Sequence, residues 1–141
     1  MIKINSKKEI ENKLREHFSQ EKDVLAVYLF GSFAQGKDNQ FSDVDVAVLL
    51  DFRIPPDQYT SQCLHFMNQL SILLKREVDV VILNKADTFI KYQVLKNGQR
   101  ILEFDMDQTR SFEARAVVEY CDYLPIRQKL EKAFIAHLKK A

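Results

Sequence analysis

Apolar residues follow two patterns along the chain, and each pattern predicts a different kind of element. Three continuous runs rich in β-branched residues predict strands buried on both faces: VLAVYLF (24–30), VDVAVLL (44–50) and VDVVIL (78–83). Apolar residues three or four positions apart predict amphipathic helices over 6–19 and 57–75. A further helix over 86–97 and a short strand over 100–104 complete the core. This order predicts a mixed α/β (α+β) fold.

The last part of the chain predicts a helical tail. Gly98 is placed to end the preceding helix in a left-handed cap, and Asp107 is placed to cap a final helix that runs to about Tyr123. Pro125 is expected to interrupt that helix before a second helical stretch continues to the end. One face of the tail is apolar, which suits either packing against the core or a surface for a partner.

Composition narrows the class of protein. The 141 residues fit a single domain over 1–141, with a core of about 20–105 and a tail of about 107–139. A formal net charge of +1 gives no strong sign of direct nucleic-acid binding. Because Cys63 and Cys121 read as buried free thiols, and no leader or membrane-spanning run is evident, we expect a cytoplasmic protein that is not bound to membrane.

The segment LFGSFAQGKDNQFSDVDVAVLL (29–50) carries the chemistry. Gly31 and Ser32 follow a buried strand, where backbone N–H groups and a hydroxyl can bind an anion, although shaping a turn would explain the glycine equally well. Asp43 and Asp45 project from the same face of the next strand, because side chains alternate along a strand. Asp79 is the one polar residue in the third strand.

If the strands that carry them are neighbours, the three carboxylates converge beside the glycine turn, and such a cluster predicts a cation site. Their repulsion and partial burial disfavour ionisation unless a cation is present, and Mg²⁺ suits carboxylates combined with substrate phosphates. A P-loop is excluded, because Lys37 is followed by Asp38 where that motif needs a hydroxyl.

These motifs identify a resemblance to a known family. The sequence Gly31-Ser32-Phe33-Ala34-Gln35-Gly36, then Ser42-Asp43-Val44-Asp45, then Asp79, resembles the polymerase-β-type nucleotidyltransferase superfamily, and within it the minimal nucleotidyltransferase (MNT) group. The likeness covers about residues 20–105 and includes NGQRILEFD (97–105). Many relatives carry a basic residue where this chain has Gln35.

The resemblance implies a fold and a reaction. It implies a polymerase-β-like nucleotidyltransferase fold, a mixed sheet flanked by helices. Asp43 and Asp45 would hold Mg²⁺ on the triphosphate of ATP, Gly31 and Ser32 would bind its phosphates, and Asp79 would act as a further metal ligand or as a base. The product would be an acceptor carrying AMP, with pyrophosphate released.

The resemblance also implies a partner. Small MNT proteins are typically antitoxins paired with HEPN-domain ribonuclease toxins, and the expected reaction is transfer of AMP to a toxin tyrosine hydroxyl. Two alternatives remain open. In the first, the chain is a non-catalytic antitoxin that neutralises its toxin by direct binding. In the second, it is a nucleotidyltransferase that acts on a small molecule.

Overall fold

The structure is a computed structural model that describes residues 6–31, 34 and 43–140. Its strands are β1 (Val24–Phe30), β2 (Val44–Leu50), β3 (Val78–Ile82) and β4 (Gln99–Glu103). Its helices are α1 (Lys7–Phe18), α3 (Tyr59–Leu74), α4 (Thr88–Asn97) and α5 (Met106–Lys139), with short 3₁₀ turns at Pro56–Gln58 and Leu83–Lys85. The strands form one sheet in the order β3-β2-β1-β4.

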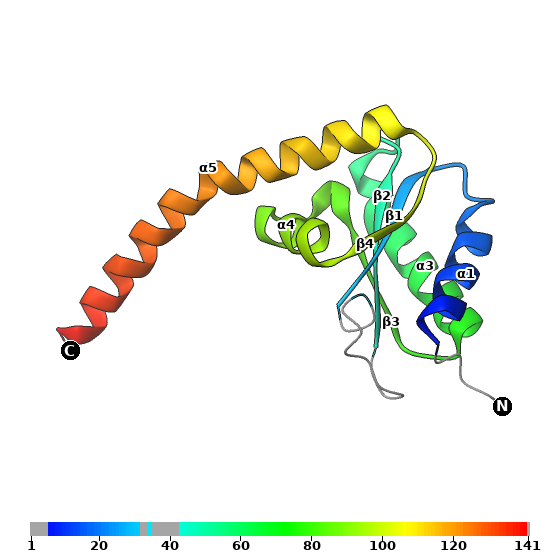
Figure 1. The fold of residues 1–141 in the computed structure, drawn as a ribbon, viewed down its shortest axis with the longest axis horizontal. Coiled ribbons are helices and arrows are strands. Elements are labelled where there is room, and N and C mark those ends of the chain that lie inside the picture. The colour runs from blue at the N-terminus through cyan, green and yellow to red at the C-terminus, as the bar shows by residue number, and fades with distance from the viewer. Residues whose placement is uncertain (1–5, 32–33, 35–42, 141) are drawn as a thin grey trace.

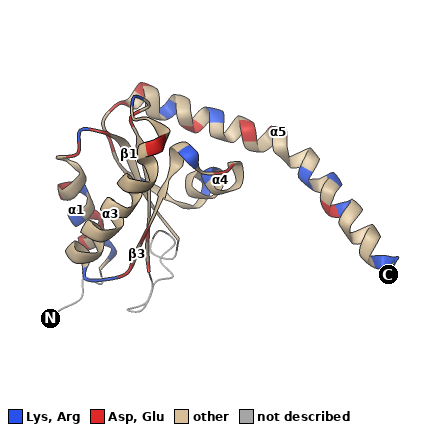
Figure 2. Cartoon of the chain, turned by 180° about the vertical axis from the view of Figure 1, so that it is seen from behind, with Lys and Arg blue, Asp and Glu red and all other residues tan. Residues whose placement is uncertain are grey.

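The sheet is mixed and covered by helices on both faces. β2 pairs antiparallel with β1 and parallel with β3, and β4 pairs antiparallel with the other edge of β1. Helices α1 and α3 lie on one side of the sheet, and α4 and α5 lie on the other (Figures 1 and 2). The predicted fold class is therefore confirmed.

Alternation along the strands divides the core into two layers. Val46 and Val48 of β2 pack with the buried residues of α1 and α3. Ala47 and Leu49 point to the opposite face, where they pack with Val94 of α4 and Phe112 of α5. Because both layers are apolar, the central strands are continuous apolar runs in the sequence, and this is why their positions were predicted correctly.

Two predicted helix ends are wrong in detail. Gly98 ends α4 in an extended conformation, with φ −93° and ψ 178°, because the chain passes directly into β4. A side chain there would meet the carbonyl oxygens of Val94 and Leu29 at 2.5 and 3.0 Å, so the position requires close packing rather than a left-handed turn. The cap of α5 is Asp105, not Asp107: its carboxylate accepts a hydrogen bond from the backbone N–H of Gln108.

The prediction that Pro125 interrupts the tail is also wrong, because α5 is one helix of 34 residues that contains it. Proline removes the hydrogen bond that would reach the carbonyl four residues earlier, at Cys121. Cys121 is exposed, so water can satisfy that carbonyl. Cys63 and Cys121 are both free thiols, but exposure of Cys121 contradicts the expectation that both are buried.

Glu113 fastens the first half of α5 to the sheet. Its carboxylate accepts hydrogen bonds from the Tyr28 hydroxyl at 2.6 Å and from Arg100 at 2.7 and 2.8 Å. Arg110 and Arg100 also bond to Glu103, so two acids and two arginines form one network. Burial, and then the bond to Glu113, raise the pKa of Tyr28, which keeps the hydroxyl protonated as a donor.

Among the described residues, α5 and every other helix fall short of the combination of length and apolar character that crossing a membrane requires.

We predict that Glu113→Ala destabilises the protein by about 2 kcal/mol, because it leaves the Tyr28 hydroxyl and Arg100 without their shared acceptor. The free energy of unfolding, from urea titration followed by circular dichroism, measures this. Tyr28→Phe is the control and should cost less, since the two remaining bonds from Arg100 stay in place. Equal costs for the two variants would contradict the central role of Glu113.

Candidate functional site

Parallel pairing of β2 with β3 brings two of the predicted acids together. Asp45 and Asp79 are direct partners in the register of these strands, so their side chains leave the same face of the sheet. Asp43 lies two residues before Asp45 and therefore shares that face, which also carries α4 and α5. Asp43 and Asp79 are exposed, whereas Asp45 is half-buried.

The three aspartates interact electrostatically. Burial raises the pKa of Asp45 to about 6, and the negative charges of Asp79 and then Asp43 contribute to the increase. The charges of Asp79 and Asp43 therefore act on Asp45 and oppose its ionisation. A strongly perturbed carboxyl group beside like charges at one edge of a sheet is typical of a functional site.

Gly31 lies directly against Asp45. β1 ends at Phe30, which pairs with Asp45, and Gly31 then adopts a left-handed backbone with φ +76°. A Cβ at Gly31 would overlap Oδ2 of Asp45 and lie 3.0 Å from its Cγ. Glycine is therefore required twice over, by its backbone conformation and by the space that the carboxylate occupies.

Part of the predicted glycine turn lies outside the described residues, including Ser32, Gln35, Gly36 and Ser42. The described residue Ala34 provides one contact that sequence reasoning missed. Its carbonyl oxygen accepts a hydrogen bond at 3.2 Å from the ammonium group of Lys7, at the start of α1. No local motif marks Lys7, because the contact joins residues 27 positions apart.

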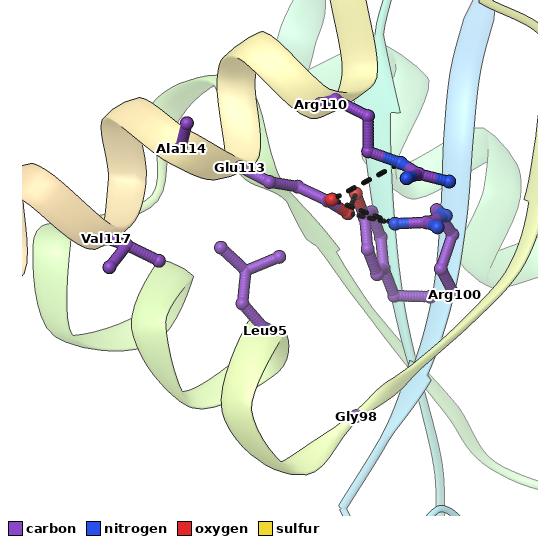
Figure 3. Close-up of a pocket in the computed structure, with 8 residues that line it drawn as sticks. Leu95, Gly98, Arg100, Arg110, Glu113, Ala114 and Val117 are labelled. Atoms are coloured by element: carbon purple, nitrogen blue, oxygen red, sulfur yellow. Dashed lines mark hydrogen bonds and ion pairs between the residues drawn. The ribbon is translucent and has the colours of Figure 1, made fainter. Parts of the chain in front are cut away.

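Two further basic side chains, Arg53 and Arg100, are already paired with acids. Arg53 bonds to Asp51 at 2.9 Å, and Arg100 bonds to Glu113 and Glu103. A cavity of about 400 Å³ lies beside Arg100 on the same face of the sheet as Asp45 (Figure 3). None of the three aspartates lines it, and its charged side chains bond to one another. We therefore assign this cavity to packing of α5 against the sheet.

The donor set at the aspartates fits a hard divalent cation. Three carboxylates supply oxygen ligands, and an added positive charge would offset the repulsion that Asp79 and Asp43 exert on Asp45. Among the residues that the structure describes, no three acidic, histidine or cysteine side chains are already arranged to enclose a metal. Mg²⁺ suits such an open set, because it completes its coordination with phosphate oxygens and water.

A curated relative shares part of this sequence. The chain is similar to the protein adenylyltransferase MntA of Shewanella oneidensis, with 35% identity over 75 residues. The aligned segment is 53% of this chain and 51% of the relative, so it spans about half the length of that protein.

Solved structures share the fold over nearly the whole chain. A toxin–antitoxin structure with AMP-PNP matches with a TM-score of 0.75 and 25% identity, covering 89% of this chain and 98% of that one. A structure of a tri-AMPylated Shewanella oneidensis HEPN toxin with its MNT antitoxin matches with a TM-score of 0.72 and 21% identity, covering 92% and 99%. The second likeness concerns the fold alone.

The match to a protein family settles the classification. Residues 12–107 match the family described as Polymerase beta, Nucleotidyltransferase. The matched range is more than half of the chain and includes the sheet, the glycine turn and all three aspartates. The chain belongs to the polymerase beta nucleotidyltransferase family.

Proposed function

We propose that this chain is an antitoxin nucleotidyltransferase that transfers AMP from ATP to a tyrosine hydroxyl of a HEPN-type toxin, with Mg²⁺ as cofactor. The observation that carries the proposal is the pairing of Asp45 with Asp79 beside Asp43, against the left-handed Gly31. The relative named as a protein adenylyltransferase and the similar toxin–antitoxin structure with AMP-PNP support it.

The proposed phosphate-binding roles follow from where each residue lies relative to the aspartates. Gly31 follows β1 and has no side chain beside Asp45, which would allow the phosphates of ATP to approach the backbone closely. Ser32, the neighbouring hydroxyl, is the second proposed phosphate ligand. Lys7, held at Ala34, brings a positive charge to the same segment.

The reaction is a single displacement at phosphorus. The acceptor hydroxyl oxygen forms a bond to the α-phosphorus, the bond to the leaving oxygen breaks, and pyrophosphate departs. Asp79 is exposed, so an incoming hydroxyl can reach it and transfer its proton to the carboxylate. Asp43 and Asp45 would hold Mg²⁺, and when bound the ion supplies positive charge that offsets charge on the phosphate oxygens.

Substitution of the aspartates tests the reaction. We expect Asp43→Asn and Asp45→Asn each to lower the rate of AMP transfer by at least about a hundredfold, because each removes charge from the reacting centre. The measurement uses ATP labelled at its α-phosphate, Mg²⁺ and a purified HEPN-domain protein as the acceptor. Asp23→Asn is the matched control, since Asp23 is exposed and precedes β1 at the other end of the sheet.

Absence of label transfer by the natural chain would contradict the enzymatic proposal. Protection of cells from the toxin by an Asp43→Asn/Asp45→Asn variant would show that binding alone neutralises it. Transfer to a small-molecule acceptor without any protein partner would favour the remaining alternative.

The pKa of Asp45 predicts how stability depends on pH without divalent ions. This pKa is about 6 in the folded protein and 3.8 for an ordinary aspartate, so the folded state binds the proton more tightly. The resulting contribution to stability is complete below about pH 4 and is lost as pH rises through 6. We expect a loss of about 1 kcal/mol, since solvent screens this half-buried group.

Urea unfolding at pH 4, 5, 6 and 7 measures this dependence in the natural chain and in Asp45→Asn. In Asp45→Asn, the free energy of unfolding should lack the decrease between pH 4 and pH 7 that ionisation of Asp45 causes in the natural chain. Identical slopes would contradict the raised pKa of Asp45 in the folded protein.

A double-mutant cycle tests the contact between Gly31 and Asp45. We expect Gly31→Ala to cost about 3 kcal/mol of stability, from backbone strain and from overlap with the carboxylate. In an Asp45→Ala background the overlap disappears, and the cost should fall to the strain alone, about 1 kcal/mol. Equal costs in the two backgrounds, measured by urea unfolding, would contradict the close contact.

A further inference from the structure

The second half of α5 carries an apolar face that the described parts of the chain leave exposed. Four large residues recur every four positions, so they lie along one side of the helix. Each side chain is more than half exposed: Ile126 57%, Leu130 62%, Phe134 62% and Leu138 55%. We call these four residues the tail stripe.

The tail stripe continues a face of α5 that packs inside the domain. Leu130 and Phe134 follow Phe112 and Ala116 by 18 residues, which is five helical turns, so each pair points the same way. Phe112 and Ala116 are buried against the domain. The same face of α5 is therefore buried in the first half of the helix and exposed to solvent in the second half.

Helix α4 covers α5 only as far as Arg127. Tyr92 stacks on Tyr120 with ring centroids 3.8 Å apart, and Arg127 lies over the ring of Phe89 at 5.1 Å. Beyond this point α5 extends away from the sheet and from α4 (Figure 1). Clustered apolar side chains on a protruding helix are typical of an interaction surface.

The charge of the same segment indicates which kind of partner would bind the tail stripe. Most charged residues in the second half of α5 are basic, and its C-terminal end is blue in Figure 2. The acid Glu131 is paired with Arg127 at 3.0 Å. The basic residues after Ile126 are Arg127, Lys129, Lys132, Lys139 and Lys140. Two copies of the chain joined through their tail stripes would bring these like charges together, whereas a partner with an acidic rim would be attracted.

We propose that the tail stripe is the docking surface for the HEPN-type partner, which contacts it with an apolar face rimmed by acidic residues. This proposal rests on the proposed function, since it names where the acceptor protein binds. Docking outside the catalytic core raises the effective concentration of the acceptor hydroxyl at Asp79 without any part in the chemistry. Loss of docking therefore has a kinetic signature different from loss of catalysis.

The test compares a stripe variant with a neighbour on another side of the helix. Leu130→Glu/Phe134→Glu introduces charge into the centre of the stripe, and we expect it to weaken binding of the same HEPN-domain protein by at least about thirtyfold. Ala136→Glu is the matched control: Ala136 is exposed and lies about 160° around the helix from Phe134. Its affinity should change by less than about threefold, as measured by isothermal titration calorimetry.

Three further measurements separate the possible outcomes. The double variant should bind AMP-PNP normally, and saturating toxin should restore its rate of AMP transfer. Asp43→Asn/Asp45→Asn should show the reverse, with toxin binding intact and AMP transfer lost. Undiminished toxin binding by Leu130→Glu/Phe134→Glu would overturn the docking surface.

The natural chain and the double variant also test whether a second copy or a membrane binds the tail stripe. Sedimentation in which the natural chain is dimeric and the double variant monomeric would assign the tail stripe to a second copy and overturn the proposal. Binding to vesicles of anionic phospholipid that the double variant loses would assign it to a membrane, with the same consequence. Toxin binding by the natural chain without AMP transfer would contradict the proposed function alone.

Discussion

Repulsion among three carboxylates is the interaction on which the candidate site depends. Folding places Asp45 opposite Asp79 in the register of two parallel strands, with Asp43 two residues away. Burial raises the pKa of Asp45 to about 6, and the charges of Asp79 and Asp43 add to the increase. Such an arrangement lowers the stability of the isolated domain, because charged groups are brought together and partly removed from water. It becomes favourable when positive charge arrives, so the site is prepared for a ligand rather than for folding.

The rest of the fold keeps these charges from moving apart. β2 is central in the sheet, with β1 bonded to one edge and β3 to the other, and its apolar residues are buried in layers on both faces. On the β1 side, Gly31 fills the space next to Asp45 with backbone alone. The carboxylates therefore have little freedom to relax, since displacing Asp45 requires disrupting close-packed core residues.

Local patterns predicted the strands and the shared face of Asp43 and Asp45, because alternation along a strand is set by the backbone. The neighbouring position of Asp79 required the sheet topology, which the resemblance to a family supplied. Contacts distant in sequence were missed: nothing near Lys7 indicates Ala34, and nothing near Gly98 indicates the carbonyl of Leu29. The prediction that Pro125 breaks the final helix was wrong for a different reason. A proline is tolerated inside a helix where solvent satisfies the carbonyl that it leaves without a hydrogen bond.

Packing, one of the two sequence interpretations of the tail, holds for the first half of α5, and partner binding is what we propose for the second half. Glu113 and Phe112 hold the first half against the sheet, and this fixes the direction in which the second half extends. A rigid continuous helix transmits that direction to the tail stripe, whereas a break at Pro125 would have left it free to swing. The same network that packs α5 would thus set the position of a docked partner relative to the aspartates. Small size is then no obstacle to acting on a large acceptor, because the acceptor can be held by a helix outside the catalytic core.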